Sequence, residues 1–382
     1  MKKVFIALAI SWLVIFLFIF DSFYFIENPL SDKLTDKARS VDPRIKILAI
    51  DDESLEKIGE WPWPRDLVAE TIEKIASNGA VAVWPDILYT EKSLNPAEDE
   101  ALSKVVEKYD NVYLPAYFEF NALQNSNKDL EHEYMKWPVV NIPDERVGHI
   151  NVLPDKDSVV RDVLLGVPNL KGEIVPIIDV RLANLLLSEN NMITWDDEYV
   201  WYRGNDYIPV DEQFQIGFSY ASSATENGFE VIPIWKVIEG KIDPGYFKDC
   251  VVMIGPYSSG LQEMYKTPIG KTEMSGVEIH ANIIQALLDN KLYTHASHDS
   301  SFMIITIMAI LGFMLFEWKK ARLGAVILVG LIVGYTGIVY IYFHSQGVLM
   351  PYFYVIFSLL IGYVVSVIDK YLTARKEKSK LI

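Results

Sequence analysis

The sequence predicts an α/β domain joined to four membrane-spanning helices, one before the domain and three after it. Two observations lead to this fold class. Four apolar segments are long enough, or nearly so, to cross roughly 30 Å of hydrocarbon, which takes about 20 residues. Between the first and second of them, residues 27–299 form a segment of 273 mixed residues, in which short apolar runs alternate with segments of helical periodicity. We therefore expect nearly all of the polar chemistry in this middle part.

The apolar segments differ in length but share an uncharged interior. The second is short and reaches full length when Trp318 and the serines before it lie in the interfacial layers. The first lacks a small-x-small cleavage pattern, so we expect an uncleaved anchor. No Asp, Glu, Lys, Arg or His lies within the apolar cores, which argues against a transporter or channel. The expected spans are Val4–Phe20, Phe302–Phe316, Leu323–Phe343 and Val348–Ile368.

The flanking basic residues predict the orientation, because short cytoplasmic segments collect Lys and Arg. Basic residues precede the first span, join the second to the third and follow the fourth, whereas the link at 344–347 has none. A multi-pass protein of the cell membrane with both termini in the cytoplasm is expected. The expected parts are a cytoplasmic N-terminus with the first span at 1–26, an external domain at 27–299, three spans at 300–368, and a short basic cytoplasmic tail at 369–382.

Charge is distributed in the same way. Residues 1–26 carry a formal net charge of +1 and residues 300–382 one of +5, so the external segment carries −22, since the whole chain is −16. Such an acidic surface repels nucleic acid, which we exclude as a partner. The one cysteine, Cys250, cannot form an intramolecular disulfide and is expected to be a small buried hydrophobe.

The external segment begins with a regular pattern. Strands at Ile45–Ile50, Ala80–Trp84 and Val112–Phe118 are expected to alternate with helices at Asp66–Ser77 and Glu98–Lys108. This β-α-β-α-β order indicates a largely parallel, helix-covered sheet with right-handed crossovers.

The middle of the segment is less regular, and the pattern returns near its end. Gly148–Val152 and Val159–Val167 are expected to be strands joined by a turn, and a helix is expected at Asp179–Leu187. A further strand, Val251–Gly255, and a helix, Val277–Leu288, lead toward the second span.

Distinctive side chains follow the ends of the expected parallel strands. Asp51 and Asp52 follow the first strand and Asp86 follows the second. Ligands of open α/β sheets bind in the crevice beyond the carboxyl ends of the strands, so we expect these acids to face one crevice. A Trp-Pro-Trp-Pro-Arg segment stands nearby at the entry to a helix. The candidate ligand-binding residues are Asp51, Asp52, Trp61, Trp63, Arg65 and Asp86.

A structural interpretation of the same residues stays open. Arg65 is expected to pair with Asp51, Asp52 or Asp86, and it then neutralises a buried acid, because unpaired buried carboxylates are costly. In this interpretation the two indoles cover the core instead of lining a crevice wall.

The same region carries a resemblance that extends over residues 40–295. The chain reads IDDESLEKIGEWPWPRD from Ile50, GAVAVWPDILYTE from Gly79, GHINVLPDKDSVVRD from Gly148 and TPIGKTEMSGVEIHANIIQALL from Thr267. These blocks, with one span before and three after, resemble the CHASE extracellular sensory domain family, second type.

The resemblance implies a bacterial extracytoplasmic sensor domain. Members are normally fused through their three spans to a cytoplasmic nucleotide cyclase, histidine kinase or similar output enzyme. Here 14 residues follow Ile368, so we expect signalling through a separate protein. The family's ligands are not defined, so the resemblance implies a role and names no molecule.

Secondary candidates lie in two of the matching blocks. Asp155 and Asp157 have a spacing seen in calcium loops, but an EF-hand loop needs more oxygen ligands. A turn whose acids pair with Arg161 is favoured.

The last block adds four further candidates. Glu278 and Asn282 lie one turn apart on one helix face, with His280 pointing elsewhere. The block contains no H-E-x-x-H zinc pattern, so His280 is expected to be a packing histidine. Thr267 is expected in a loop turn.

The sequence therefore favours an integral membrane sensor or signal-transduction subunit without enzymatic activity of its own. Its expected partners are the lipid bilayer and a cytoplasmic or membrane signalling protein, with a homodimer as an open alternative. No cofactor is expected, and the presence of a metal is open. Two alternatives stay open: an extracytoplasmic metal-dependent hydrolase using Asp51, Asp52 or Asp86, and a non-catalytic membrane scaffold. The order Asp51-Asp52-Glu53-Ser54 lacks the D-x-D-x-T arrangement of a phosphatase.

Overall fold

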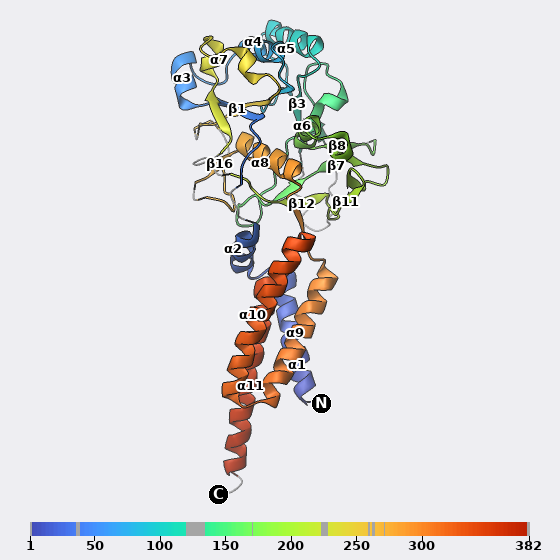
Figure 1. Ribbon diagram of the computed structural model, residues 1–382, viewed down its shortest axis with the longest axis vertical. Helices are drawn as coiled ribbons and strands as arrows, with labels where there is room; N and C mark the ends of the chain where they lie inside the picture. The colour runs from blue at the N-terminus through green and yellow to red at the C-terminus, as the bar shows by residue number, and fades with distance from the viewer. Residues whose placement is uncertain are drawn as a thin grey trace. The chain divides into compact units, whose positions relative to one another are not determined.

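The chain forms an α/β unit and a helical unit, which Figure 1 labels by element. A computed structural model describes residues 2–35, 39–119, 134–169, 171–222, 228–258, 260–261, 264–270 and 272–379. The α/β unit comprises residues 36–292, and the helical unit comprises residues 1–35 and 293–382.

A four-stranded parallel sheet forms the centre of the α/β unit. Its strand order is β13-β1-β14-β2, and each neighbouring pair is parallel. The prediction of a parallel, helix-covered sheet is thus confirmed. The strands are β1 (Ile45–Ile50), β2 (Ala82–Pro85), β13 (Glu230–Pro233) and β14 (Val251–Pro256).

The third predicted strand lies largely outside this sheet. β3 (Leu114–Glu119) is parallel to β5 (Val147–His149) and antiparallel to β4 (Tyr134–Lys136). Its link to the central sheet is a single parallel bridge between Val112 and Val83. The chain order of the strands is therefore not their order in the sheet: β14, a strand from late in the chain, lies between β1 and β2.

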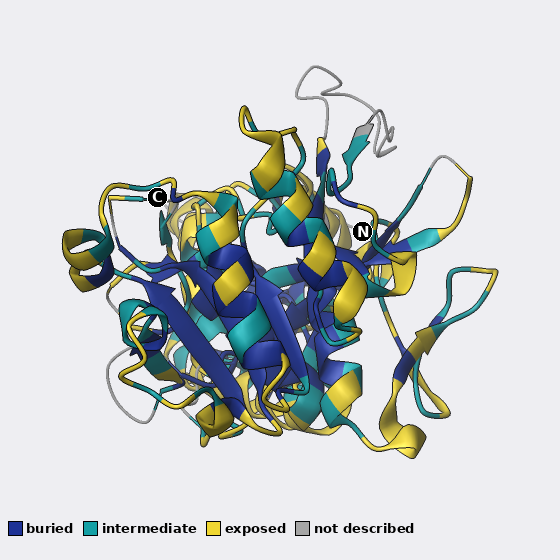
Figure 2. Ribbon diagram, turned by 90° about the horizontal axis from the view of Figure 1, so that it is seen from above, coloured by how far each residue is buried: buried dark blue, intermediate teal, exposed yellow. Residues whose placement is uncertain are grey.

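Helices cover both faces of the central sheet. Alternate side chains of a strand point to opposite faces; thus Ile47 joins one core and Leu48 the other. One face packs against α6 (Ile178–Leu186) and α8 (Gly276–Asp289), and the other against α4 (Arg65–Ala76) and α5 (Pro96–Lys108). Figure 2 shows buried strands beneath helices whose outer faces are exposed. Cys250 is buried, as predicted.

Short elements complete the α/β unit. The predicted pairing of two strands around Asp155 is wrong: β6 pairs with β12, and β5 pairs with β3. The turn itself is present, since Ser158 N donates to Asp155 O at 2.8 Å. The remaining elements are α3 (Asp52–Ile58), β6 (Asp162–Leu164), β7 (Gly166–Pro168), β8 (Ile174–Pro176), β9 (Ile193–Trp195), β10 (Trp201–Arg203), β11 (Asp206–Ile208), β12 (Gln215–Phe218), α7 (Trp235–Ile238), β15 (Met264–Tyr265) and β16 (Met274–Ser275), with single 3-10 turns at Asp144–Arg146, Glu189–Asn191 and Pro244–Phe247.

Three helices in the described part of the helical unit are long and apolar enough to cross a membrane. They are α9 (His298–Trp318), α10 (Ala321–Gln346) and α11 (Tyr352–Ser379). The predicted fourth span is corrected at its start, because Val348 and Leu349 form β18 (Val348–Leu349), which is parallel to β17 (Leu292–His295).

The N-terminal helix differs from the other three. The segments Lys3–Ile19 and Tyr24–Thr35 pass the length and composition test together, but they bend by 81° at the break between them. They belong to α1 (Lys2–Ile19) and α2 (Tyr24–Thr35). The N-terminal span stays a prediction.

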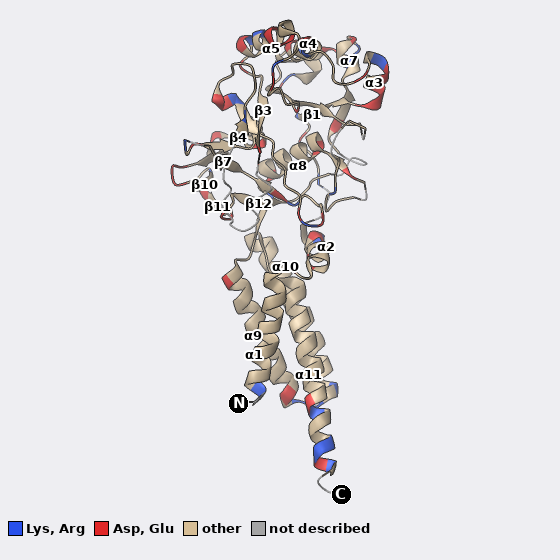
Figure 3. Ribbon diagram, turned by 180° about the vertical axis from the view of Figure 1, so that it is seen from behind, with Lys and Arg blue, Asp and Glu red and all other residues tan. Residues whose placement is uncertain are grey.

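The helical unit has its own apolar core and polar contacts. Val14, Ile305 and Val355 are buried together. The Glu27 carboxylate accepts hydrogen bonds from Tyr352 N at 2.6 Å and Phe353 N at 2.7 Å, so α2 caps the first turn of α11. Basic residues gather at the C-terminal end of α11 (Figure 3).

Candidate functional site

The carboxyl ends of the central strands lie at one edge of the sheet. Ile50 of β1 is opposite Pro256 of β14, and Ile254 of β14 is opposite Pro85 of β2. Asp86 therefore extends directly from this edge, where its N–H donates to Ile254 O at 2.7 Å. This is the edge at which open α/β sheets bind ligands.

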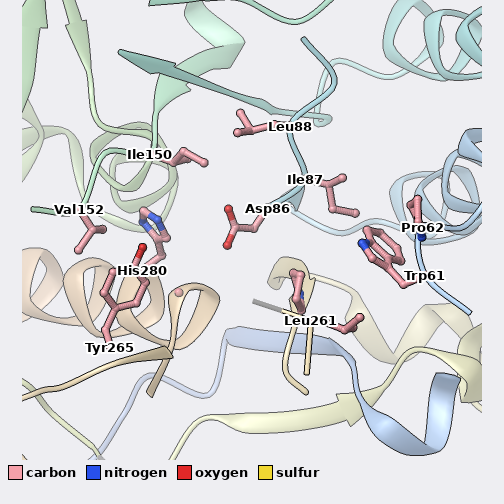
Figure 4. A pocket seen from close by; sticks show the side chains of 12 residues that line it. Trp61, Pro62, Asp86, Ile87, Leu88, Ile150, Val152, Leu261, Tyr265 and His280 are labelled. Atoms are coloured by element: carbon pink, nitrogen blue, oxygen red, sulfur yellow. The ribbon is translucent and has the colours of Figure 1, made fainter. Parts of the chain in front are cut away.

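A cavity of about 570 Å³ opens at this edge. Its volume lies within the range of small-molecule sites, roughly 300–1,000 Å³. Figure 4 shows the Asp86 carboxylate turned toward the His280 ring, with Trp61 and Pro62 on the other side. The lining residues are Trp61, Pro62, Asp86, Ile87, Leu88, Ile150, Val152, Pro256, Leu261, Tyr265, Gly276 and His280.

Close packing fixes the position of Asp86. A Cβ atom on Gly255 would lie 2.8 Å from the Val277 Cβ and 3.3 Å from the Asp86 Cβ, so glycine lets strand β14 and helix α8 approach. The Asp86 side chain is 8% exposed. Burial raises its pKa, against the attraction of His280. No hydrogen-bond donor among the described residues contacts its carboxylate.

His280 is held from behind by a buried acid. Its Nδ1 lies 2.8 Å from the Asp179 Oδ2, and both side chains are buried. Burial alone would lower the pKa of His280, but its pair with Asp179 and the charge of Asp86 outweigh burial and raise it. His280 is buried and bonded, as predicted of a packing histidine. It also lines the cavity, which was not predicted.

Two further candidates in α8, Glu278 and Asn282, form hydrogen bonds with other residues of the α/β unit. The Tyr257 hydroxyl donates to Glu278 Oε2 at 3.0 Å, and burial raises the pKa of Glu278 to about 7. Asn282 Oδ1 accepts from Ala221 N at 2.9 Å and from Ser222 N at 3.1 Å. Asn282 thus has a structural contact that ties α8 to the chain near residue 221.

The predicted partner of Arg65 is wrong. Its Nη1 lies 2.6 Å from the Asp99 Oδ1, and its Nη2 donates to Glu91 O at 2.7 Å. Its guanidinium also lies 5.2 Å from the Tyr89 ring centroid. Arg65 therefore joins the starts of α4 and α5 and does not neutralise a strand-end acid.

The two tryptophans have different surroundings. Trp63 is buried in the core beneath α4, where its Nε1 donates to Gly59 O at 2.8 Å. Trp61 stacks edge-on against Trp63, with 5.4 Å between ring centroids, and lines the cavity. The structural interpretation thus fits Trp63, and the crevice-wall interpretation fits Trp61.

The acids after β1 are bonded to nearby serines. Asp51 Oδ1 accepts from Ser54 N at 2.9 Å and from Ser54 Oγ at 2.6 Å, which caps α3. Asp52 accepts a hydrogen bond from Ser258 Oγ. Neither acid is among the cavity-lining residues, whereas Asp86 is.

The remaining candidates lie away from the cavity lining. Arg161 Nη1 is 2.7 Å from Asp155 Oδ2 and 2.9 Å from Asp157 Oδ1, so the predicted pairing is confirmed. Burial raises the pKa of Asp155, against its hydrogen bond from Arg161. Thr267 Oγ1 donates to Ile269 O at 2.8 Å, as expected of a loop turn.

Sequence reasoning missed several cavity residues and the partner of His280. Asp179 lay in a predicted helix, where an acid in the first turn is common, and no local pattern connects it to His280, 101 residues later. Ile150 and Val152 alternate along the chain as in a strand, and this pattern does not indicate that they line a cavity. In the described residues no group of three His, Cys, Asp or Glu side chains could hold a metal ion.

The comparisons with known proteins identify the family. No curated protein and no solved structure matches the chain. The sequence model of the CHASE2 domain matches residues 7–316, which include the cavity, Asp179 and all but the last two residues of α9. The match covers well over half of the chain and agrees with the blocks around Ile50, Gly79, Gly148 and Thr267. The chain belongs to the CHASE2 domain family of sensory domains.

Proposed function

We propose that this chain is an integral membrane sensor whose external domain binds a ligand in the Asp86 cavity and whose membrane helices pass the signal to a cytoplasmic effector. The observation that carries the proposal is the residue Asp86, which is 8% exposed and borders a cavity of about 570 Å³. A buried carboxylate is costly unless it is paired. A ligand in the cavity supplies the missing partner. Family membership and the apolar helices support the same role.

The helix α11 is a suitable transmission element. Its 28 residues extend for about 42 Å at 1.5 Å per residue, which exceeds the ~30 Å of hydrocarbon. Its last turns carry the exposed basic residues Arg375, Lys376 and Lys378. By the positive-inside rule this end is cytoplasmic, and we propose that the effector binds there. Transmission requires that the ligand bind two arrangements of the helices with different affinity.

Crosslinking in native membranes tests the proposal. Full-length tagged protein is purified after mild crosslinking, and the proteins bound to it are identified by mass spectrometry. We expect a kinase, cyclase or other cytoplasmic signalling enzyme. The triple variant Arg375→Glu, Lys376→Glu, Lys378→Glu should lose it, because the contact is made by basic side chains.

A control variant makes the same change of charge in the external domain. Lys171, Lys241 and Lys248 are exposed there, and their change to Glu should leave the effector bound. If the protein is recovered alone, or if the enzyme stays bound to the tail variant, the sensor proposal is wrong. The scaffold or a self-contained external activity then becomes the better explanation.

A further inference from the structure

The cavity walls combine a broad apolar surface with one polar corner. Trp61, Ile87 and Ile150 are among the apolar residues, and Asp86 and His280 form the polar corner with Tyr265 (Figure 4). A ligand that fills this space needs an apolar body, because burying apolar surface drives binding. It also needs one polar group that can meet the corner.

The polar corner has one charge that the protein does not balance. His280 is already bonded to Asp179, with 2.8 Å between Nδ1 and Oδ2, so its ring is shared between two buried acids. Asp86 has no such pair, and no donor in the described part of the chain contacts its carboxylate. Even with His280 protonated, two ionised carboxylates beside one imidazolium would carry a net charge of −1, which one positive charge neutralises.

The Asp86 carboxyl is held in place at the cavity wall, where burial raises its pKa and a bound cation would favour its charged form. The backbone of Asp86 is bonded to Ile254 O at 2.7 Å, so the residue cannot swing away to a distant donor. A Cβ atom on Gly276 would lie 3.7 Å from Asp86 Oδ2, which places this oxygen beside the first residue of α8. The N-terminal end of a helix stabilises negative charge. The carboxylate is therefore a fixed acceptor at the cavity wall.

We infer that the cavity binds a small organic cation, a protonated amine with an apolar body, and that Asp86 is its counter-ion. This inference rests on the proposed function and names the chemical class of the ligand. The amine donates to the Asp86 carboxylate in a charge-assisted hydrogen bond. The apolar body lies against Ile87 and Ile150, and Trp61 extends the apolar wall on the side away from His280.

Other ligand classes fit the cavity less well. An anion would be repelled by Asp86 and would leave that carboxylate unpaired. A divalent metal ion prefers several oxygen ligands, and among the described residues no group of three His, Cys, Asp or Glu side chains could hold one. A small hydrated cation gains nothing from the apolar walls.

Binding of three matched probes to the full-length protein in detergent tests the inference. The probes are 2-phenylethylamine, 2-phenylethanol and phenylacetate, which share a body and differ in charge. Isothermal titration calorimetry should detect the amine and show at least about tenfold weaker binding of the alcohol and the acid. Asp86→Asn should weaken amine binding at least about tenfold.

Two variants act as controls. Asp110→Asn removes the same charge from an exposed loop position and should leave amine binding unchanged. Gly276→Leu places a side chain beside Asp86 and should abolish amine binding, while thermal unfolding confirms that the variant folds. The inference is overturned if the alcohol binds as well as the amine, if Asp86→Asn binds the amine normally, or if no probe binds.

The two proposals fail in different ways. If no amine binds but the effector still depends on the basic end of α11, the sensor proposal stands and the ligand class is wrong. If the amine binds through Asp86 but no effector is recovered, the cation site stands and the sensor proposal is wrong.

Discussion

The acidic side chains in two regions near the same edge of the central sheet differ in their burial and in their hydrogen-bond donors. After β1, Asp51 and Asp52 accept hydrogen bonds from serines and are half-exposed or exposed. After β2 and at the start of α8, Asp86 and Glu278 are buried, with no donor to Asp86 among the described residues and one hydroxyl at Glu278. Asp51, Asp52 and Asp86 all follow the ends of strands, so local donors and burial decide which acid is structural and which is left for a ligand.

The largest expected effect concerns Glu278. Its pKa in the folded protein is raised from 4.5 to about 7, so the folded state binds an extra proton between these pH values. Stability therefore falls as the pH rises through this window, by roughly 3 kcal/mol in total. Glu278→Gln keeps an acceptor for the Tyr257 hydroxyl but cannot ionise. Unfolding of the full-length protein in detergent across this pH range should show a flatter slope for the variant.

Glu53→Gln is the matched control, because Glu53 is exposed near the end of β1. It should keep the slope of the unmodified protein. An unchanged slope in Glu278→Gln would show that burial of this carboxylate does not govern the pH dependence, and the contrast between the two regions would lose one of its supports.

Smaller changes in the free energy of unfolding, opposite in sign to each other, are expected when Asp51 and Asp86 are substituted. Asp51→Ala removes the cap of α3 and should lower the free energy of unfolding by about 1–2 kcal/mol, whereas Asp51→Asn keeps an acceptor and should change it little. Asp86→Asn removes a buried, unpaired charge and should raise stability at neutral pH. Chemical denaturation measures both. Destabilisation by Asp86→Asn would mean that the carboxylate has a structural partner.

The smallest expected effect concerns Asp52 and its partner Ser258. Removing one side of an exposed or partly exposed hydrogen bond costs about 0.5–1.5 kcal/mol. Asp52→Ala and Ser258→Ala should each lie in this range, and the double variant should cost less than their sum because both remove the same contact. A double-mutant cycle from denaturation curves measures the coupling, and additive effects would contradict a direct bond.

The sequence predicted the parts of this site better than their arrangement. Asp86 and Trp61 could be predicted because strand ends and Trp-Pro segments leave a local pattern. The pairing of Arg65 with Asp99 could not be predicted, because Asp99 lies 34 residues away. Its helix has the acidic pattern that is typical of a solvent-exposed face. The pairing of Asp179 with His280 likewise joins two helices without any shared motif.

The sheet shows the same limit. Strands were predicted at Ile45–Ile50 and Val251–Gly255, and both are present, the second extending to Pro256. An apolar run does not specify its neighbour, so nothing in either strand predicted that they would pair. The edge strand β13 was missed because it has four residues, one of them Glu and one Pro, and both residue types are uncommon in strands.

The placement of β14 between β1 and β2 has a consequence for biosynthesis. Neither early strand can complete its pairing until residues about 200 positions after β1 have been made. At roughly 5–20 residues per second, this delay is about 10–40 s. During that time β1 and β2 present open, apolar strand edges, which are prone to pair with other chains. A nascent chain of this protein therefore depends on protection until its central strand arrives, and a translation stop before Val251 would leave an aggregation-prone fragment.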